Sequence, residues 1–264
     1  KASKVYMRNT GSSKSDFFYV AKHASAAASD TAAVTIDLDA TAHTAGIRNI
    51  DISAASKATG NVIKVDEYTG LYEADGMVLT GSATGITTIT GGAGDDTITG
   101  GTAADVILGG AGADTINVGS GVGVDDVQIS GVNQNAEYTT GYAGTSIATT
   151  GMDIVSGLNS GDDISLTGYT TTAATAPDTA VLDSNALTKA ADLSVTMTDN
   201  AVQIVRGTYI TNVFSESATG ADALFIYDSQ VDKTNVDYEA FVIIGGGAFT
   251  YTVDAGTGGN VSIA

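Results

Sequence analysis

A nine-residue pattern repeats in one register in the middle of this 264-residue chain. Residues 91–99 (GGAGDDTIT) and 109–117 (GGAGADTIN) match the pattern G-G-x-G-x-D-x-U-x at every fixed position, where U is a large aliphatic residue. Residues 100–108 (GGTAADVIL) lack only the third glycine, which is replaced by Ala103, and a degenerate copy with a two-residue insertion follows over 119–127. Three consecutive copies at fixed spacing indicate a repeat architecture, because ordinary turn sequences do not recur in register.

The spacing predicts a β-solenoid. Each copy forms a six-residue turn followed by a three-residue strand, so two copies complete one coil and copies two apart stack on the same edge. This stacking places Asp96 beside Asp114 on one edge and Asp105 beside Asp125 on the other. The glycines permit positive φ and leave carbonyls pointing into the space between turns. The aliphatic residues are expected to stack inward, and they are Ile89, Ile98, Ile107 and Ile116.

Carboxylates and turn carbonyls in this arrangement offer a metal ion only oxygen ligands. Calcium is a hard cation that takes six to eight oxygens, and it would turn the repulsion between stacked carboxylates into coordination. The alternative is that the Gly-Gly and Asp-Asp pairs are ordinary turn residues, which is the commoner interpretation of any single copy. The predicted ligands are the carboxylates of Asp95, Asp96, Asp105, Asp114 and Asp125 and the carbonyls of Gly92, Gly94, Thr102, Gly110 and Gly112.

The charge distribution agrees with a bound cation. Eleven Lys and Arg against thirty Asp and Glu give a formal charge of -19, which disfavours nucleic acids and anionic membranes as partners. Between Lys64 and Lys189 the chain has sixteen acids and no basic residue, whereas a solvated surface normally mixes both signs. Cysteine is absent, which excludes disulfides and thiolate zinc sites. Calcium is therefore the expected stabilising element.

The rest of the chain is predicted to be nearly all β, because apolar residues recur at period two between Gly, Asn and Asp. Only residues 17–28 and 184–191 have the composition of short helices. No segment is apolar over a length that spans a bilayer, so we expect a soluble chain without membrane insertion. Outside the repeats, strands are expected at residues 34–38, 47–52, 61–65, 86–90, 127–129, 164–167, 201–205, 209–214, 223–227, 240–244 and 249–253.

On these residues the chain resembles the RTX (repeats-in-toxin) family, whose nonapeptides form calcium-loaded parallel β-rolls. The match covers residues 91–127, and it departs from the family in its few copies and in Ala103, which is expected to weaken the second site. The resemblance implies type I secretion, an uncleaved C-terminal secretion signal, and folding outside the cell where calcium is abundant. The expected organisation is a β-rich region over 1–76, the calcium-binding β-roll over 77–130, and a β-rich domain with the secretion signal over 131–264.

A second segment, residues 151–166 (GMDIVSGLNSGDDISL), resembles the D-x-I-x-x-F-x-x-G-D-x-I-x-L element that often follows RTX rolls. It departs from that element at Val155 and at Leu158, where an aromatic residue is usual. The turn carboxylates of Asp162 and Asp163 suit an oxygen-only calcium site. The alternative is a hairpin with an Asn-Ser-Gly-Asp turn.

Nothing in the sequence indicates an enzyme. His23 and His43 lack a neighbouring acid or partner histidine, and neither HExxH nor GxSxG occurs. Adjacent aspartates on a strand point to opposite faces and do not share a substrate.

Bacterial surface-layer proteins resemble this chain in being acidic, Cys-free and rich in Thr, Ala and Gly. We therefore expect a secreted structural component of a surface layer (S-layer), with copies of itself as partner through calcium-dependent contacts and with cell-surface glycan or lipopolysaccharide as a further partner. The alternatives are a calcium-stabilised region of an RTX adhesin and the non-catalytic C-terminal part of a secreted RTX exoenzyme.

Overall fold

The computed structural model describes residues 4–8, 16–21, 33–38, 47–55, 57–65, 76–130, 146–167, 202–228, 238–253 and 260–264. These residues form β-strands and one short 3-10 helix, η2 (Gly246–Ala248). Within them there is no helix long and apolar enough to cross a membrane. The chain divides into two compact units, Lys1–Val127 and Gln128–Ala264. The first unit contains strands before and after residue 76, where the sequence predicts the end of the N-terminal region.

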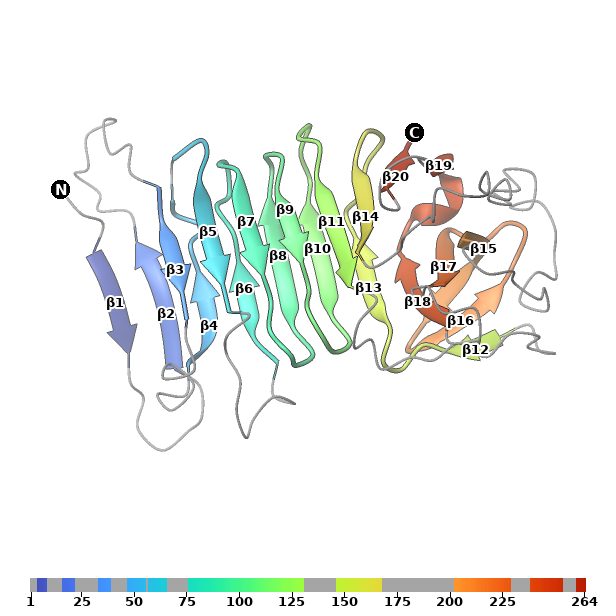
Figure 1. Ribbon diagram of the computed structural model, residues 1–264, viewed down its shortest axis with the longest axis horizontal. Helices are drawn as coiled ribbons and strands as arrows, with labels where there is room; N and C mark the ends of the chain where they lie inside the picture. Colours follow the sequence, from blue (N-terminus) through green and yellow to red (C-terminus); the bar gives the residue numbers. More distant parts are fainter. Residues whose placement is uncertain are drawn as a thin grey trace, which may run out of the picture. The chain divides into compact units, whose positions relative to one another are not determined.

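The first unit is a parallel β-solenoid built from two sheets (Figure 1). Strand neighbours from β2 to β10 in one sheet and from β3 to β9 in the other run parallel, whereas β1 and β2 run antiparallel. The first sheet has the order β1 (Lys4–Arg8), β2 (Asp16–Ala21), β4 (Ile47–Asp51), β6 (Val78–Thr80), β8 (Thr97–Gly101) and β10 (Thr115–Gly119). The second has the order β3 (Thr35–Asp37), β5 (Asn61–Lys64), β7 (Thr87–Thr90), β9 (Val106–Leu108) and β11 (Asp126–Ser130), and only the first two residues of β11 belong to this unit.

The register of these strands confirms that two nonapeptides make one coil. Ile98 lies opposite Ile116 in one sheet, and Ile89 lies opposite Ile107 in the other. All four side chains are fully buried, as the repeat predicts, and burial of such a side chain contributes about 1.5 to 3 kcal/mol. Ile63 continues the second column one coil before Ile89. The solenoid therefore begins before the nonapeptides do.

The second unit combines a mixed sheet with a smaller antiparallel one. In the larger sheet β13 and β18 run parallel and the remaining pairs antiparallel. It has the order β13 (Asp153–Ser156), β18 (Tyr238–Ile243), β17 (Asp222–Asp228), β15 (Val202–Ile210), β16 (Val213–Glu216) and β12 (Ser146–Ala148). The smaller has the order β14 (Asp163–Thr167), β20 (Asn260–Ile263) and β19 (Tyr251–Val253).

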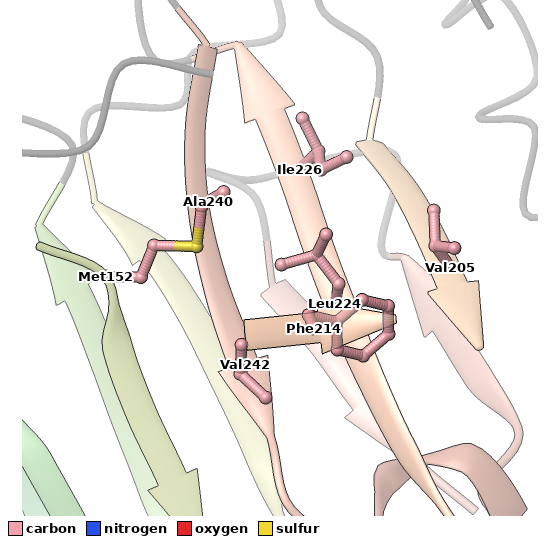
Figure 2. Close-up of a cluster of buried hydrophobic side chains, with 7 residues drawn as sticks. All are labelled: Met152, Val205, Phe214, Leu224, Ile226, Ala240 and Val242. Atoms are coloured by element: carbon pink, nitrogen blue, oxygen red, sulfur yellow. The ribbon is translucent and has the colours of Figure 1, made fainter. Parts of the chain in front are cut away.

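Alternating side chains bury both faces of the strands β17 and β18. On one face an apolar cluster includes Met152, Phe214 and Leu224, which Figure 2 shows packed across neighbouring strands. On the other face the rings of Phe225 and Phe241 stack with centroids 4.9 Å apart. This burial on both sides explains why β17 reads as an almost continuous apolar run, ALFIY.

The structure corrects two predicted elements. The helix expected at 17–28 is wrong over its described part, because Asp16–Ala21 is the strand β2, which pairs with β1 and β4. The strand expected at 209–214 is broken by a hairpin turn at Thr211 and Asn212, both at positive φ (45° and 60°), between β15 and β16. The helix expected at 184–191 lies outside the described residues.

Candidate metal centre

The aspartates at the sixth position of the repeats form two columns, one along each edge of the solenoid. The amide of Asp96 donates a 2.8 Å hydrogen bond to Asp114 Oδ1, and the amide of Asp105 donates a 2.7 Å bond to Asp125 Oδ1. All four residues are at most 3% exposed. The structure thus brings together the pairs that two-copy stacking predicts, with buried carboxylates on successive coils.

The second carboxylate oxygen closes the turn of its own copy. Asp96 Oδ2 accepts a 2.8 Å hydrogen bond from the amide of Gly92, and Asp105 Oδ2 accepts a 2.6 Å bond from the amide of Gly101. The same side chain therefore fixes the shape of one turn and links it to the preceding coil. The hydrogen-bond donors in these contacts are neutral backbone amides, so they leave the carboxylate charge uncompensated.

Burial makes this charge costly. It raises the pKa of the Asp96 carboxyl from 3.8 to about 6, although amide hydrogen bonds from Gly92 and Met77 oppose the shift and the neighbouring Asp95 adds to it. Burial also raises the pKa of Asp105, again against two amide hydrogen bonds. A buried carboxylate prefers protonation when no positive charge faces it. A cation between the coils would remove that preference.

The first glycine of each copy makes room for oxygen atoms from two coils. A Cβ added at Gly91 would collide with the carbonyl oxygen of Gly109 and stand 2.5 Å from Asp96 Oδ2. At Gly100 the corresponding atoms are the carbonyl oxygen of Val118 and Asp105 Oδ2, the latter 2.9 Å away. Carboxylate and carbonyl oxygens thus converge where a side chain would otherwise stand. A donor set of this kind fits calcium.

Three of the five predicted carbonyl ligands face the next coil on their own edge. The carbonyl of Gly92 accepts a 2.9 Å hydrogen bond from the amide of Ala111. The carbonyl of Gly94 would lie 2.7 Å from a Cβ at Gly112, and that of Thr102 would collide with one at Gly121. Gly110 and Gly112 lie opposite Gly92 and Gly94 at φ values of 118° and 119°, which leave space for the facing carbonyls.

Backbone carbonyls would be needed to complete the coordination. Within the described residues no group of three or more His, Cys, Asp or Glu side chains is placed to hold a metal ion. Two stacked carboxylates supply too few oxygens for a cation that takes six to eight. Asp96 with Asp114, and Asp105 with Asp125, would therefore hold calcium together with the turn carbonyls, and the ion would supply the missing positive charge.

The replacement of the third glycine by Ala103 introduces no backbone strain. Among the described residues only Thr211 and Asn212 have positive φ without being glycine, so Ala103 adopts an ordinary conformation. The facing turn has Gly123 in contact with Ala103, where an added Cβ would collide with the Ala103 backbone. A weaker second site stays a prediction.

The remaining predicted ligands lie in other surroundings. Asp95 is exposed, and its Oδ1 accepts a 2.9 Å hydrogen bond from the amide of Ala113. Asp162 is buried in the turn before β14, where Oδ2 accepts a 2.6 Å bond from the amide of Asn159. Asp163 Oδ1 accepts a 2.7 Å bond from the hydroxyl of Ser262. These contacts agree with turn and strand-pairing roles, and metal binding by the three residues stays a prediction.

Two polar residues that sequence reasoning did not single out lie in the same column as Asp105. Thr87 lies one coil before Asp105, and Asn61, which pairs in register with Thr87, lies two coils before it. Both residues are buried. Neither matches the repeat signature, which requires aspartate at this position. Their spacing from Ile89 and Ile63, two residues before each inward aliphatic side chain, is the signal that would have revealed them.

The comparisons with known proteins agree with this geometry. A family model of the RTX calcium-binding nonapeptide repeat, in four copies, matches residues 84–124. No curated protein and no solved structure matches the chain. RTX repeat proteins are typically secreted. The turns that stack Asp96 on Asp114 and Asp105 on Asp125 are therefore RTX calcium-binding nonapeptide repeats, and they form an RTX-type calcium-binding region within the chain.

Proposed function

We propose that this chain is a structural component of a bacterial surface layer, which folds and self-assembles in calcium after export by a type I system. The observation that supports the proposal most is the burial of stacked carboxylates, Asp96 on Asp114 and Asp105 on Asp125, on the two solenoid edges. Their coordination by calcium links the stability of the fold to the calcium concentration of the surroundings. A protein built in this way is suited to fold outside the cell.

Composition supports a structural role over a catalytic one. The sequence has no zinc-protease or serine-hydrolase motif, and its two histidines have no partner in sequence. The formal charge of -19 keeps copies apart by repulsion, and divalent cations reduce that repulsion. Copies of the same chain are therefore the proposed partner, with cell-surface glycan or lipopolysaccharide as the anchor. On this proposal the chain is not an enzyme.

Electron microscopy of the purified chain tests the proposal. Ordered sheets are expected in millimolar calcium and are expected to disperse when excess chelator is added. A matched control is the double variant Asp96→Asn with Asp114→Asn, which keeps side-chain size and removes the charge of one column. A wild-type chain that stays monomeric in calcium would rule out the lattice and favour the adhesin or exoenzyme alternatives.

A further inference from the structure

Both edges of the solenoid lose their aspartate one coil before the repeats. On one edge Met77 occupies the equivalent position, and its amide donates a 2.6 Å hydrogen bond to Asp96 Oδ1. On the other edge Thr87 occupies it, and its amide donates a 2.7 Å bond to Asp105 Oδ1. The first carboxylate of each column therefore rests on a coil that has no carboxylate at that position. We call residues 57–65 and 76–90 the N-terminal coils and residues 91–127 the repeat turns.

Hydroxyl groups close the turn before Thr87. Thr87 Oγ1 accepts a 3.0 Å hydrogen bond from the amide of Ser82, which matches the contact that Asp105 Oδ2 makes with Gly101. Ser82 Oγ in turn accepts a 2.9 Å bond from the amide of Gly85 and donates a 2.7 Å bond to the carbonyl of Ala55 in the preceding coil. Thr87 and Ser82 are both fully buried. Neutral side chains thus perform the turn-closing role of the aspartate without introducing a charge.

Asn61 joins two coils through its side-chain amide. Its Nδ2 donates 3.0 Å hydrogen bonds to the carbonyl of Lys57 in its own turn and to the carbonyl of Ile86 in the next coil. Its Oδ1 accepts a 3.2 Å bond from the amide of Val34, in the manner of Asp105 toward Thr87. The residue is 1% exposed. The amide nitrogen therefore binds carbonyl oxygens of successive coils, as a calcium ion held by the turn carbonyls would do between the repeat turns.

We propose that the N-terminal coils fold without calcium, with Asn61 Nδ2 in the place of a cation, and that they form the template on which the calcium-dependent repeat turns stack. Coils of a solenoid contact mainly their neighbours, so a preformed coil removes the cost of starting the stack. The amides of Met77 and Thr87 are then already positioned to receive Asp96 and Asp105. This inference rests on calcium binding by the repeats and does not depend on the surface-layer proposal.

Hydrogen exchange of the full chain, followed by mass spectrometry in calcium and in excess chelator, tests the template. Peptides covering 57–65 and 81–90 are expected to keep their protection in chelator. Peptides covering 97–119 are expected to exchange at least about tenfold faster there than in calcium. Loss of protection in both regions together would overturn the proposal, because the N-terminal coils would then depend on calcium as the repeats do.

Two substitutions at Asn61 test the role of the amide nitrogen. Asn61→Ala removes both donors and is expected to speed exchange in 57–65 and 81–90 by about tenfold or more, in calcium and chelator alike. Asn61→Asp places a carboxylate at the repeat position, so we expect fast exchange in chelator, protection restored by calcium, and more calcium bound than in the wild type. Asn117→Asp, at an exposed position of β10, is the charge-matched control and should leave the N-terminal coils protected in chelator.

Each Asn61 variant has one result that would contradict the proposal. Unchanged exchange in Asn61→Ala would show that the amide bridge does not hold the coils together. Fast exchange in Asn61→Asp that calcium does not reverse would show that Nδ2 does not stand in a cation's place. Either result overturns the proposal, and neither bears on whether the repeat turns bind calcium.

Discussion

The amide of Asp105 donates a 2.7 Å hydrogen bond to Asp125 Oδ1 although the two residues are 20 positions apart, whereas Asp96 and Asp114 make the same contact at a separation of 18. The two extra residues of the fourth copy are accommodated at the tip of its turn, where Val122 and Val124 are 103% and 54% exposed. The carboxylate column therefore keeps its register through a change in turn length.

Removing a charge from a column should weaken calcium binding. Asp114→Asn is expected to lower calcium affinity by about tenfold or more, because a ligand charge is lost while the volume is kept. Adding Asp96→Asn should cost less than the sum of the single effects, because both residues serve one site. Asp95→Asn, at an exposed position, should cost less than Asp114→Asn. Calcium titrations by calorimetry compare the wild type with Asp114→Asn, Asp96→Asn, the double variant and Asp95→Asn, and equal effects of Asp95→Asn and Asp114→Asn would contradict the assignment.

The two glycines that open each copy should differ in their tolerance of a side chain. At Gly91 a Cβ would collide with the carbonyl of Gly109 and crowd Asp96 Oδ2, so Gly91→Ala is expected to weaken both fold and calcium binding. At Gly92 the nearest atom to an added Cβ is the carbonyl oxygen of Val65 at 3.5 Å, an ordinary contact. Gly92→Ala should therefore stay close to the wild type. Thermal unfolding in saturating calcium compares the two, and similar losses would count against this geometry.

The raised pKa of Asp96 predicts opposite pH responses with and without calcium. Its pKa of about 6 in the fold exceeds the ordinary value of 3.8, so the fold favours the protonated carboxyl. In chelator this contribution to stability is fully present below about pH 4 and is lost as the pH rises through about 6. In calcium the ligand must be deprotonated, so affinity should fall as the pH drops through about 6.

Thermal melts between pH 4 and 7 measure both responses. The control is Asp96→Asn, which cannot titrate at this position. In chelator, its melting temperature should therefore change much less with pH than that of the wild type. If the melting temperature of the wild type in chelator rises steadily from pH 4 to pH 7, the direction of the pH dependence that we derive from burial of Asp96 is wrong.

The inward isoleucines should carry much of the stability of the roll. Ile98→Ala leaves a cavity between Leu79 and Ile116, its neighbours in the column, and is expected to cost about 2 to 5 kcal/mol. Val122→Ala, on a fully exposed side chain, should change stability by less than about 0.5 kcal/mol. Denaturant unfolding in saturating calcium gives both free energies. A small loss in Ile98→Ala would mean that metal coordination alone holds the coils.

The repeat region could be predicted from sequence because its spacing determines its geometry. A nine-residue register with aspartate at the sixth position and an aliphatic residue at the eighth fixes which carboxylates meet and which side chains point inward. Asn61 and Thr87 escaped this reasoning because they serve the same column with different chemistry, so no signature residue marks them. Their role follows only from the contacts of Asn61 Nδ2 and Thr87 Oγ1.

The errors elsewhere have local causes. Residues 16–21 precede an alanine-rich stretch that suggested a helix, but the sequence DFFYVA has the aromatic and β-branched content of a strand, and pairing with β1 and β4 decided the outcome. The hairpin at Thr211 and Asn212 was missed because it lacks the glycine usual at positive φ. In both places the pairing partner lies outside any short window of sequence.

The amide bridge at Asn61 also has an evolutionary consequence. Asparagine and aspartate codons differ at a single base, so one point mutation exchanges an internal donor for a ligand at this position. On the inference drawn from Asn61, this single change would add a calcium ligand to a coil that otherwise folds without the ion. The dependence of the coil on calcium would then change while the stack of isoleucines stays the same.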